Sequence, residues 1–270
     1  MLKKLLKYDF KAIFKYWWIA AVINLLLSVY GGFIQLIENY NQVLADTLAS
    51  LIGLSTFMVN CSYVALLIVT LVLLFIRFYQ NFFTDEGYLT FTLPVSRSQL
   101  LNSKVIAGVS MLMLSVVVCL VNSAIKNTIA WWPELTAGTY PENYIAQGIE
   151  NHGRYFWVFE IEGIVLAMVL VVLVVMILYF CITFGSMIVK KGKLLLSIVL
   201  CYLISNVISA IGLFSMVFWA LGYSFFLDST ADQSPLTALI LLGLIFYGGL
   251  LSGLLYSLQY GMLDRRLNLS

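Results

Sequence analysis

The chain contains six long runs without any charged residue, and charged residues lie between these runs. The runs are Tyr16–Ile37, Thr47–Ile76, Val105–Ile125, Gly163–Val189, Leu194–Leu227 and Gln233–Leu263. Each is longer than the roughly 20 residues that a helix needs to cross about 30 Å of hydrocarbon. Helices satisfy their own backbone hydrogen bonds in lipid, and the sequence lacks the short alternating segments of a β-barrel. The pattern predicts an all-α polytopic membrane protein, a single transmembrane domain over residues 1–270 with six transmembrane helices.

Composition supports this fold class. Apolar residues make up 62% of the chain and charged residues 10%, whereas about a quarter of the residues of a soluble domain are charged. The net charge is +2 and the basic residues are scattered between the runs, so we expect no binding to nucleic acid. All four cysteines fall inside the predicted spans, where we expect them to pack as small residues without forming disulfides.

The basic residues also predict the orientation of the chain. Thirteen of the 15 lysines and arginines lie at the N-terminus, in the second and fourth connections between spans, or at the C-terminus. The other two, Lys126 and Arg154, lie in the third connection. Basic residues accumulate on the cytoplasmic side of membrane proteins. We therefore expect a multi-pass protein with both termini in the cytoplasm.

Residues 1–16 combine two helical stripes. Apolar residues recur at helical spacing from Leu2 to Trp17, and the other stripe consists of Lys4, Lys7, Lys11 and Lys15. A basic amphipathic helix of this kind lies in the membrane interface, with its lysines toward anionic headgroups. We expect residues 1–16 to form such a helix in contact with membrane lipid.

Two further segments are unusual in length. Leu194–Leu227 is too long for one ordinary span and too short for two. We expect span 5 plus a re-entrant element at residues 194–227, with a bend near Gly212 or Gly222, because such backbone is tolerated where protein covers it. Residues 126–160 form the largest outer segment, long enough for a lid or small cap but not for a separate domain.

The longest polar segment on the cytoplasmic side covers residues 77–104. Pro94 disfavours helix at the residue before it, and Ser96-x-x-Gln99 is a capping box that starts a new helix. The expected structure is a helix, a sharp break and a second helix at the membrane surface. Its aromatic and apolar residues need a partner surface, either membrane or protein: Phe82, Phe83, Tyr88, Leu89 and Phe91.

Polar residues within the spans are few. The runs contain no acid or base, which argues against an ion-coupled transporter. Glu160 and Glu162, at the outer start of the fourth span, are expected to be solvated. Asn60, Ser205, Asn206 and Ser209 are expected to form hydrogen bonds between helices or, alternatively, to face a substrate. Gly249-x-x-x-Gly253 is a weak signal for close approach of another helix.

Catalytic and metal-binding motifs are missing from the sequence. There is no H-E-x-x-H motif, no paired cysteine and histidine set and no P-loop, and His152 is the single histidine. We expect the chain not to be an enzyme and to bind no cofactor of its own.

The segment Asp85–Lys104, D-E-G-Y-L-T-F-T-L-P-V-S-R-S-Q-L-L-N-S-K, resembles the permease subunits of bacterial ATP-binding-cassette (ABC) exporters of the type-2 permease family. The resemblance implies a location in the bacterial plasma membrane and a coupling helix between spans 2 and 3. It also implies an ATPase subunit that binds ATP and Mg²⁺, and a second permease, identical or homologous, that completes a dimer. The residues expected to contact the ATPase are Asp85, Glu86, Gly87, Tyr88, Leu89, Phe91, Pro94, Arg97 and Gln99.

In such permeases spans 2 and 5 typically line the central path. The resemblance thus places Thr56 and Asn60 of span 2, and Ser205, Asn206 and Ser209 of span 5, on the substrate path. The expected function is ATP-driven export of an amphipathic or hydrophobic substrate such as a peptide, lipid or drug. The alternative is a non-transporting immunity or sensor protein that binds a peptide or partner through residues 126–160.

Overall fold

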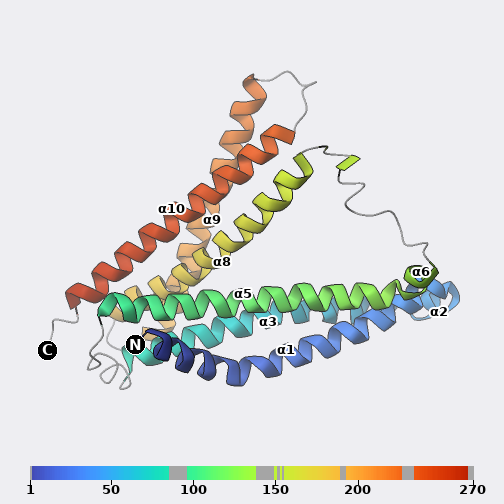
Figure 1. The fold of residues 1–270 in the computed structure, drawn as a ribbon, viewed down its shortest axis with the longest axis horizontal. Helices are drawn as coiled ribbons and strands as arrows, with labels where there is room; N and C mark the ends of the chain where they lie inside the picture. Colours follow the sequence, from blue (N-terminus) through green and yellow to red (C-terminus); the bar gives the residue numbers. More distant parts are fainter. Residues whose placement is uncertain are drawn as a thin grey trace. The chain divides into compact units, whose positions relative to one another are not determined.

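A computed structural model of the chain describes residues 2–84, 96–137, 149–150, 153, 155–188, 193–226 and 234–266. Within these residues the chain forms helices and no strands (Figure 1). The helices are α1 (Leu2–Tyr40), α2 (Gln42–Thr47), α3 (Ala49–Phe83), α5 (Arg97–Ala130), α6 (Trp132–Ala137), α8 (Tyr155–Ile188), α9 (Lys193–Phe226) and α10 (Ser234–Arg266).

Six of these helices are long and apolar enough to cross a membrane, namely α1, α3, α5, α8, α9 and α10. They confirm the prediction of six helices of sufficient length and apolar character, one in each uncharged run. The shortest has 33 residues, which corresponds to about 50 Å of helix at 1.5 Å per residue. Each helix is therefore longer than the hydrocarbon core and continues beyond it at one end or both.

Two helices continue where the sequence predicts a change of structure. Helix α1 includes both residues 2–16 and the first uncharged run. Within it Lys4, Lys7, Lys11 and Lys15 are exposed, while its position at the membrane interface stays a prediction. Helix α9 passes through Gly212 and Gly222 without interruption, so the described residues do not contain the predicted bend. Residues 227–233 lie outside the described part, and the re-entrant element stays a prediction.

Helix α5 begins where the capping box predicts. The Ser96 hydroxyl accepts a hydrogen bond from the backbone N–H of Gln99 at 3.4 Å. The Ser96 carbonyl accepts one from the N–H of Leu100 at 3.1 Å. Ser96 therefore caps the helix that continues into the third span.

The chain divides into two compact units, where the sequence predicts one transmembrane domain. The first unit contains Met1–Arg77 and Ile106–Asn143, and the second contains Phe78–Val105 and Tyr144–Ser270. The boundary falls within α3 and α5, so each of these two helices contributes residues to both units.

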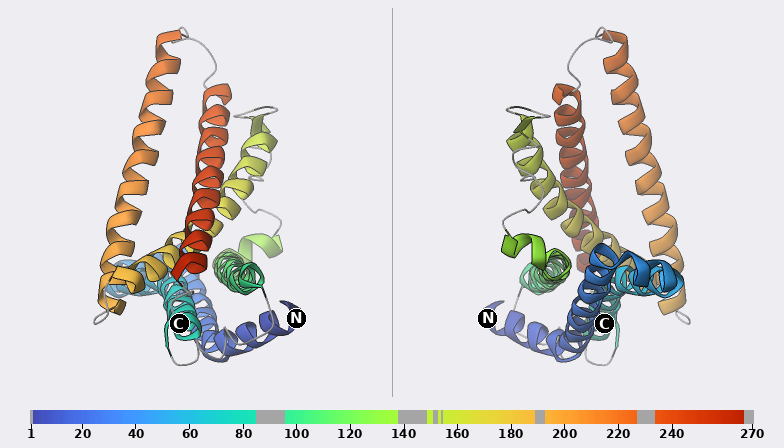
Figure 2. Two further views of the ribbon diagram at one scale, coloured as in Figure 1. Left: turned by 90° about the vertical axis from the view of Figure 1, so that its left-hand side faces the viewer. Right: turned by 90° about the vertical axis from the view of Figure 1, so that its right-hand side faces the viewer.

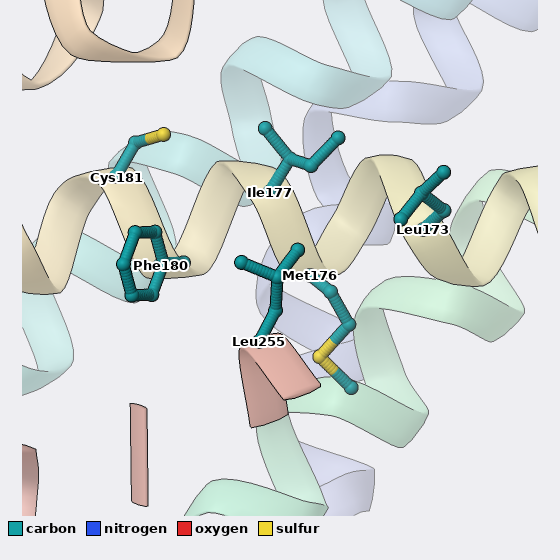
Figure 3. Close-up of a cluster of buried hydrophobic side chains, with 6 residues drawn as sticks. All are labelled: Leu173, Met176, Ile177, Phe180, Cys181 and Leu255. Atoms are coloured by element: carbon teal, nitrogen blue, oxygen red, sulfur yellow. The ribbon is translucent and has the colours of Figure 1, made fainter. Parts of the chain in front are cut away.

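In the second unit, α8 packs against both α9 and α10 (Figure 2). The core of this unit consists of Leu173, Met176, Ile177, Phe180, Cys181 and Leu255 (Figure 3). All but Leu255 belong to α8. Helix α8 is therefore the central helix of this unit.

The contact between α8 and α10 corrects the predicted role of Gly249 and Gly253. Space is open beside both of these glycines. Gly248 instead approaches α8 so closely that an added Cβ would lie 2.7 Å from Val169 Cγ1. Ser252, one turn further along, is buried too. The small residues that bring the helices together are thus Gly248 and Ser252, one position earlier than predicted.

Candidate functional site

The predicted coupling residues Asp85, Glu86, Gly87, Tyr88, Leu89, Phe91 and Pro94 lie outside the described residues. Arg97 and Gln99 lie in the first turn of α5. The structure does describe what holds the two ends of this segment, the end of α3 and the start of α5. Residues 78–105, which include both ends, belong to the second unit.

Aromatic side chains hold the end of α3. Phe78 is 1% exposed and its ring stacks on that of Tyr179 in α8, with 4.1 Å between centroids and 10° between planes. The Phe82 ring packs on Phe78 at 4.9 Å. Aromatic pairs of this kind contribute about 0.5–1.5 kcal/mol beyond the area they bury. The last turns of α3 are therefore fixed to the C-terminal half of α8.

Hydrogen bonds and apolar packing hold the start of α5. Leu100 and Leu101 are fully buried. The Tyr256 hydroxyl of α10 donates to Asn102 Oδ1 at 2.6 Å. The Tyr179 hydroxyl of α8 donates to the carbonyl of Lys104 at 3.3 Å. Both ends of the segment thus contact helices that come much later in the sequence, a connection that sequence reasoning missed.

An ion pair connects the N-terminal segment to α3 in the first unit. Asp9 is 3% exposed, and its Oδ1 lies 3.9 Å from Nε of Arg77. The Arg77 side chain is half-buried, and its removal would leave the buried carboxylate of Asp9 without this cation. The N-terminal part of α1 is therefore held at the last residue of α3 that belongs to the first unit.

A ladder of polar side chains joins α1, α3 and α5 in the first unit. The indole Nε1 of Trp17 donates to Thr70 Oγ1 at 3.1 Å and to Ser115 Oγ at 2.8 Å. The two hydroxyls lie 2.7 Å apart. All three side chains are buried. Each of the three helices thus contributes one polar residue to this contact.

A second group of the ladder lies further along the same helices. Asn122 Nδ2 of α5 donates to Asn24 Oδ1 of α1 at 2.6 Å. Asn24 Nδ2 donates to Ser62 Oγ of α3 at 2.9 Å, and the hydroxyls of Ser28 and Tyr63 are hydrogen-bonded at 3.1 Å. Polar residues of this kind hold helices together in lipid, where apolar surface provides no driving force.

Sequence reasoning missed this ladder, although a signal for it was present. Trp17, Asn24 and Ser28 are separated by seven and four positions. Residues with this spacing share one face of a helix. A polar face on an otherwise apolar helix is the pattern that would have indicated it.

Of the five residues predicted to line the substrate path, two lie in the first unit and three in the second, and their common path stays a prediction. Thr56 and Asn60 are exposed on α3 in the first unit, and Ser205, Asn206 and Ser209 lie on α9 in the second. The Ser205 hydroxyl and the Asn206 amide both donate to the carbonyl of Tyr202 in their own helix, at 2.9 and 2.7 Å. Among the described residues, none of the five forms a hydrogen bond between helices. The described part of the chain thus contains none of the bonds between helices that were expected for Asn60, Ser205, Asn206 and Ser209.

An apolar groove of about 460 Å³ lies between α1 and α3 of the first unit. Its lining is almost entirely apolar and includes Ile23, Leu27, Phe57 and Val69, with Asn24 and Ser62 of the polar ladder at one wall. Pockets of this size and character suit apolar ligands. An acyl chain or another apolar chain fits such a surface.

Glu162 of α8 differs from its expected state. The sequence predicts a solvated carboxylate, but this side chain is 8% exposed. Its Oε2 has no hydrogen-bond partner among the described residues. Glu160, two positions earlier, is half-buried and does interact with a neighbour. The chain therefore buries a carboxyl group within a helix that is apolar enough to span a membrane.

The described residues contain no group of three histidine, cysteine, aspartate or glutamate side chains that could hold a metal ion. Comparison of the chain with models of protein families, with curated proteins and with solved structures gave no match.

Proposed function

We propose that the chain is the permease subunit of an ABC exporter in the bacterial plasma membrane, with both termini in the cytoplasm. A separate subunit hydrolyses ATP with Mg²⁺, and a second permease completes the transporter. Six membrane-spanning helices, the distribution of lysine and arginine, and the wording of Asp85–Lys104 support the proposal.

The attachment of both ends of the coupling segment is the observation that carries this proposal. The end of α3 stacks on α8 through Phe78 and Tyr179. The start of α5 is hydrogen-bonded to α10 through Asn102 and Tyr256. A force applied to residues 85–95 is transmitted through these contacts to α8 and α10, beyond the two helices that the segment connects.

The proposed mechanism uses these contacts. ATP binding draws the two ATPase subunits together, and they move the coupling segment of each permease. The outward-open state is favoured by the differential affinity of ATP for the closed ATPase dimer. Tyr88, Leu89 and Phe91 fill the groove of the ATPase, while Asp85 and Glu86 pair with basic residues at its rim.

The surface of the spans supports an amphipathic or hydrophobic substrate. The groove between α1 and α3 has a nearly apolar lining. The exposed residues of α9 include Leu195, Tyr202 and Phe214. A substrate with apolar parts, such as a peptide, a lipid or a drug, can remain in contact with these helices.

Affinity capture tests the proposal. The tagged chain is purified in mild detergent from membranes of its source organism, and co-purifying proteins are identified by mass spectrometry. We expect an ATPase with a P-loop that hydrolyses ATP in the presence of Mg²⁺. Replacement of Asp85–Phe91 by a Gly-Ser linker of equal length abolishes its capture. The same replacement at residues 139–145 is the matched control and leaves capture intact.

The competing function predicts a different result. A non-transporting immunity or sensor protein purifies without an ATPase and retains its partner after the change at residues 85–91. It loses that partner after the change at residues 139–145. Either of these observations would replace the permease with the alternative.

A further inference from the structure

The buried carboxyl group of Glu162 lies well inside α8. It follows the first residue of the helix, Tyr155, by seven positions, which corresponds to about 10 Å along the axis. The neighbouring residues Ile161 and Ile164 are strongly exposed, at 62% and 56%. Glu162 therefore points away from the face of α8 that those two residues expose.

The face that carries Glu162 packs against α10. Glu162 is followed at spacings of four, three and four by Leu166, Val169 and Leu173, which places all four residues on one face. Val169 meets Gly248 of α10, and Leu173 belongs to the same buried cluster as Leu255 of α10. Glu162 thus lies on the side of α8 toward α10, at the Tyr155 end of their contact.

The three helices of this bundle carry basic residues only at the start of α9, Lys193, and at the end of α10, Arg265 and Arg266. Residues 155–188 and 194–263 contain no lysine, arginine or histidine. An ionised carboxylate without a partner in an apolar environment is costly, and acidic residues in membrane spans pair with other groups and mark the pathways of substrates or ions. Arg154, the nearest basic residue in the sequence, lies outside the described residues.

We infer that Glu162 binds the ammonium group of an amphipathic molecule whose apolar part lies along the α8 and α10 faces. A primary ammonium donates charge-assisted hydrogen bonds to the carboxylate. The uncharged helices provide the apolar surface for the rest of the ligand. The inference rests on the proposed function in one respect: if the chain is an exporter subunit, the site narrows its substrate class to cationic amphipathic molecules.

The ammonium group has two possible sources, a solute or the headgroup of phosphatidylethanolamine. Both present the same chemistry to the carboxylate, and they are distinguished by lipid composition. If the lipid occupies the site, replacing half of the phosphatidylcholine around the protein by phosphatidylethanolamine weakens binding of a soluble ammonium probe. If a solute is the ligand, this replacement leaves the affinity of the probe unchanged.

The experiment measures binding of dansylcadaverine, an apolar dye with a primary ammonium group, to the purified chain in phosphatidylcholine nanodiscs. Empty nanodiscs give the background. We expect Glu162→Gln to weaken binding at least tenfold and Glu162→Asp, which keeps the charge, to weaken it less. Glu160→Gln is the matched control and binds as the wild type does. The N-acetylated, uncharged probe binds wild type and Glu162→Gln equally.

Two results would overturn the inference. One is equal affinity of the wild type and a folded Glu162→Gln variant for the charged probe. The other is binding by Arg154→Gln but not by the wild type, which would mean that Arg154 already neutralises Glu162. Thermal unfolding of each variant shows that it is folded, and Glu162→Asp provides the comparison if Glu162→Gln does not fold.

The assay contains neither ATP nor an ATPase, so it is independent of the capture experiment. If the wild-type chain captures no ATPase but binds the probe through Glu162, the permease proposal is contradicted and the ammonium site stands. If it captures an ATPase but wild type and Glu162→Gln bind the probe with equal affinity, the ammonium site is contradicted and the permease proposal stands.

Discussion

At the scale of residues, the face of the helix decides what a polar side chain does in these spans. Asn24 and Asn60 are the same residue type in two apolar helices. Asn24 is 1% exposed and bonds Ser62 and Asn122 of two other helices. Asn60 is exposed and forms no hydrogen bond to a described residue. The first therefore stabilises the helix bundle, and the second is free for an external partner.

Asn24→Leu should destabilise the first unit. It leaves the buried amide of Asn122 without its acceptor, and an unsatisfied buried group costs about 1–3 kcal/mol. Thermal or denaturant unfolding in detergent measures the change in the free energy of unfolding. Asn60→Leu is the matched control, for which we expect a change within about 0.5 kcal/mol, as for other surface positions. Equal losses in the two variants would show that the ladder contributes little to stability.

The sequence indicates which residues are polar but not which of them meet. Thr56 and Asn60 are visible as polar residues in an apolar run, and so are Asn24 and Ser62. Only the relative rotation of the helices distinguishes exposed from paired residues, and hydropathy contains no information on that rotation. The polar ladder was therefore found only in the structure, whereas the coupling segment is a prediction from its own residues.

At the scale of elements, the six spans were predictable because hydropathy and length determine them directly. Their contacts were not. The prediction named Gly249 and Gly253, one position after the residues that pack. A shift of one position turns the side chain about 100° around the helix, so the predicted face differs from the face that packs. The length of α9 was evident, but the sequence suggested a bend where the helix continues through Gly212 and Gly222.

Gly248→Val and Gly249→Val test the contact between α8 and α10. A Cβ at Gly248 would lie 2.7 Å from Val169 Cγ1, whereas the space beside Gly249 is open. Overpacking of this kind costs typically about 1–3 kcal/mol. We expect Gly248→Val to lower the free energy of unfolding by this amount and Gly249→Val to have a much smaller effect. The reverse order would place the contact on the face predicted from the sequence.

At the scale of the whole molecule, the proposed coupling depends on contacts that the two ends of residues 85–95 make in the second unit. Tyr256→Phe removes the hydroxyl that donates to Asn102 and keeps the ring. Tyr260 of the same helix is more exposed, and its hydroxyl bonds no described residue. We expect Tyr256→Phe to lower transport per ATP hydrolysed roughly three- to tenfold, the effect of about 1 kcal/mol of lost hydrogen bonding. Tyr260→Phe leaves this ratio unchanged.

The proposed interface with an ATPase is expected to depend on apolar contacts more than on charge. Buried aromatic and apolar groups at the centre of an interface can dominate its binding energy, whereas charges at the rim contribute modestly. Tyr88→Ala and Leu89→Ala should therefore uncouple ATP hydrolysis from transport more strongly than Glu86→Ala. Rates of both processes in proteoliposomes that contain the complete transporter measure the difference. Equal rates in all three variants would mean that these residues do not fill a groove of the ATPase, and the coupling role of residues 85–95 would have to be abandoned.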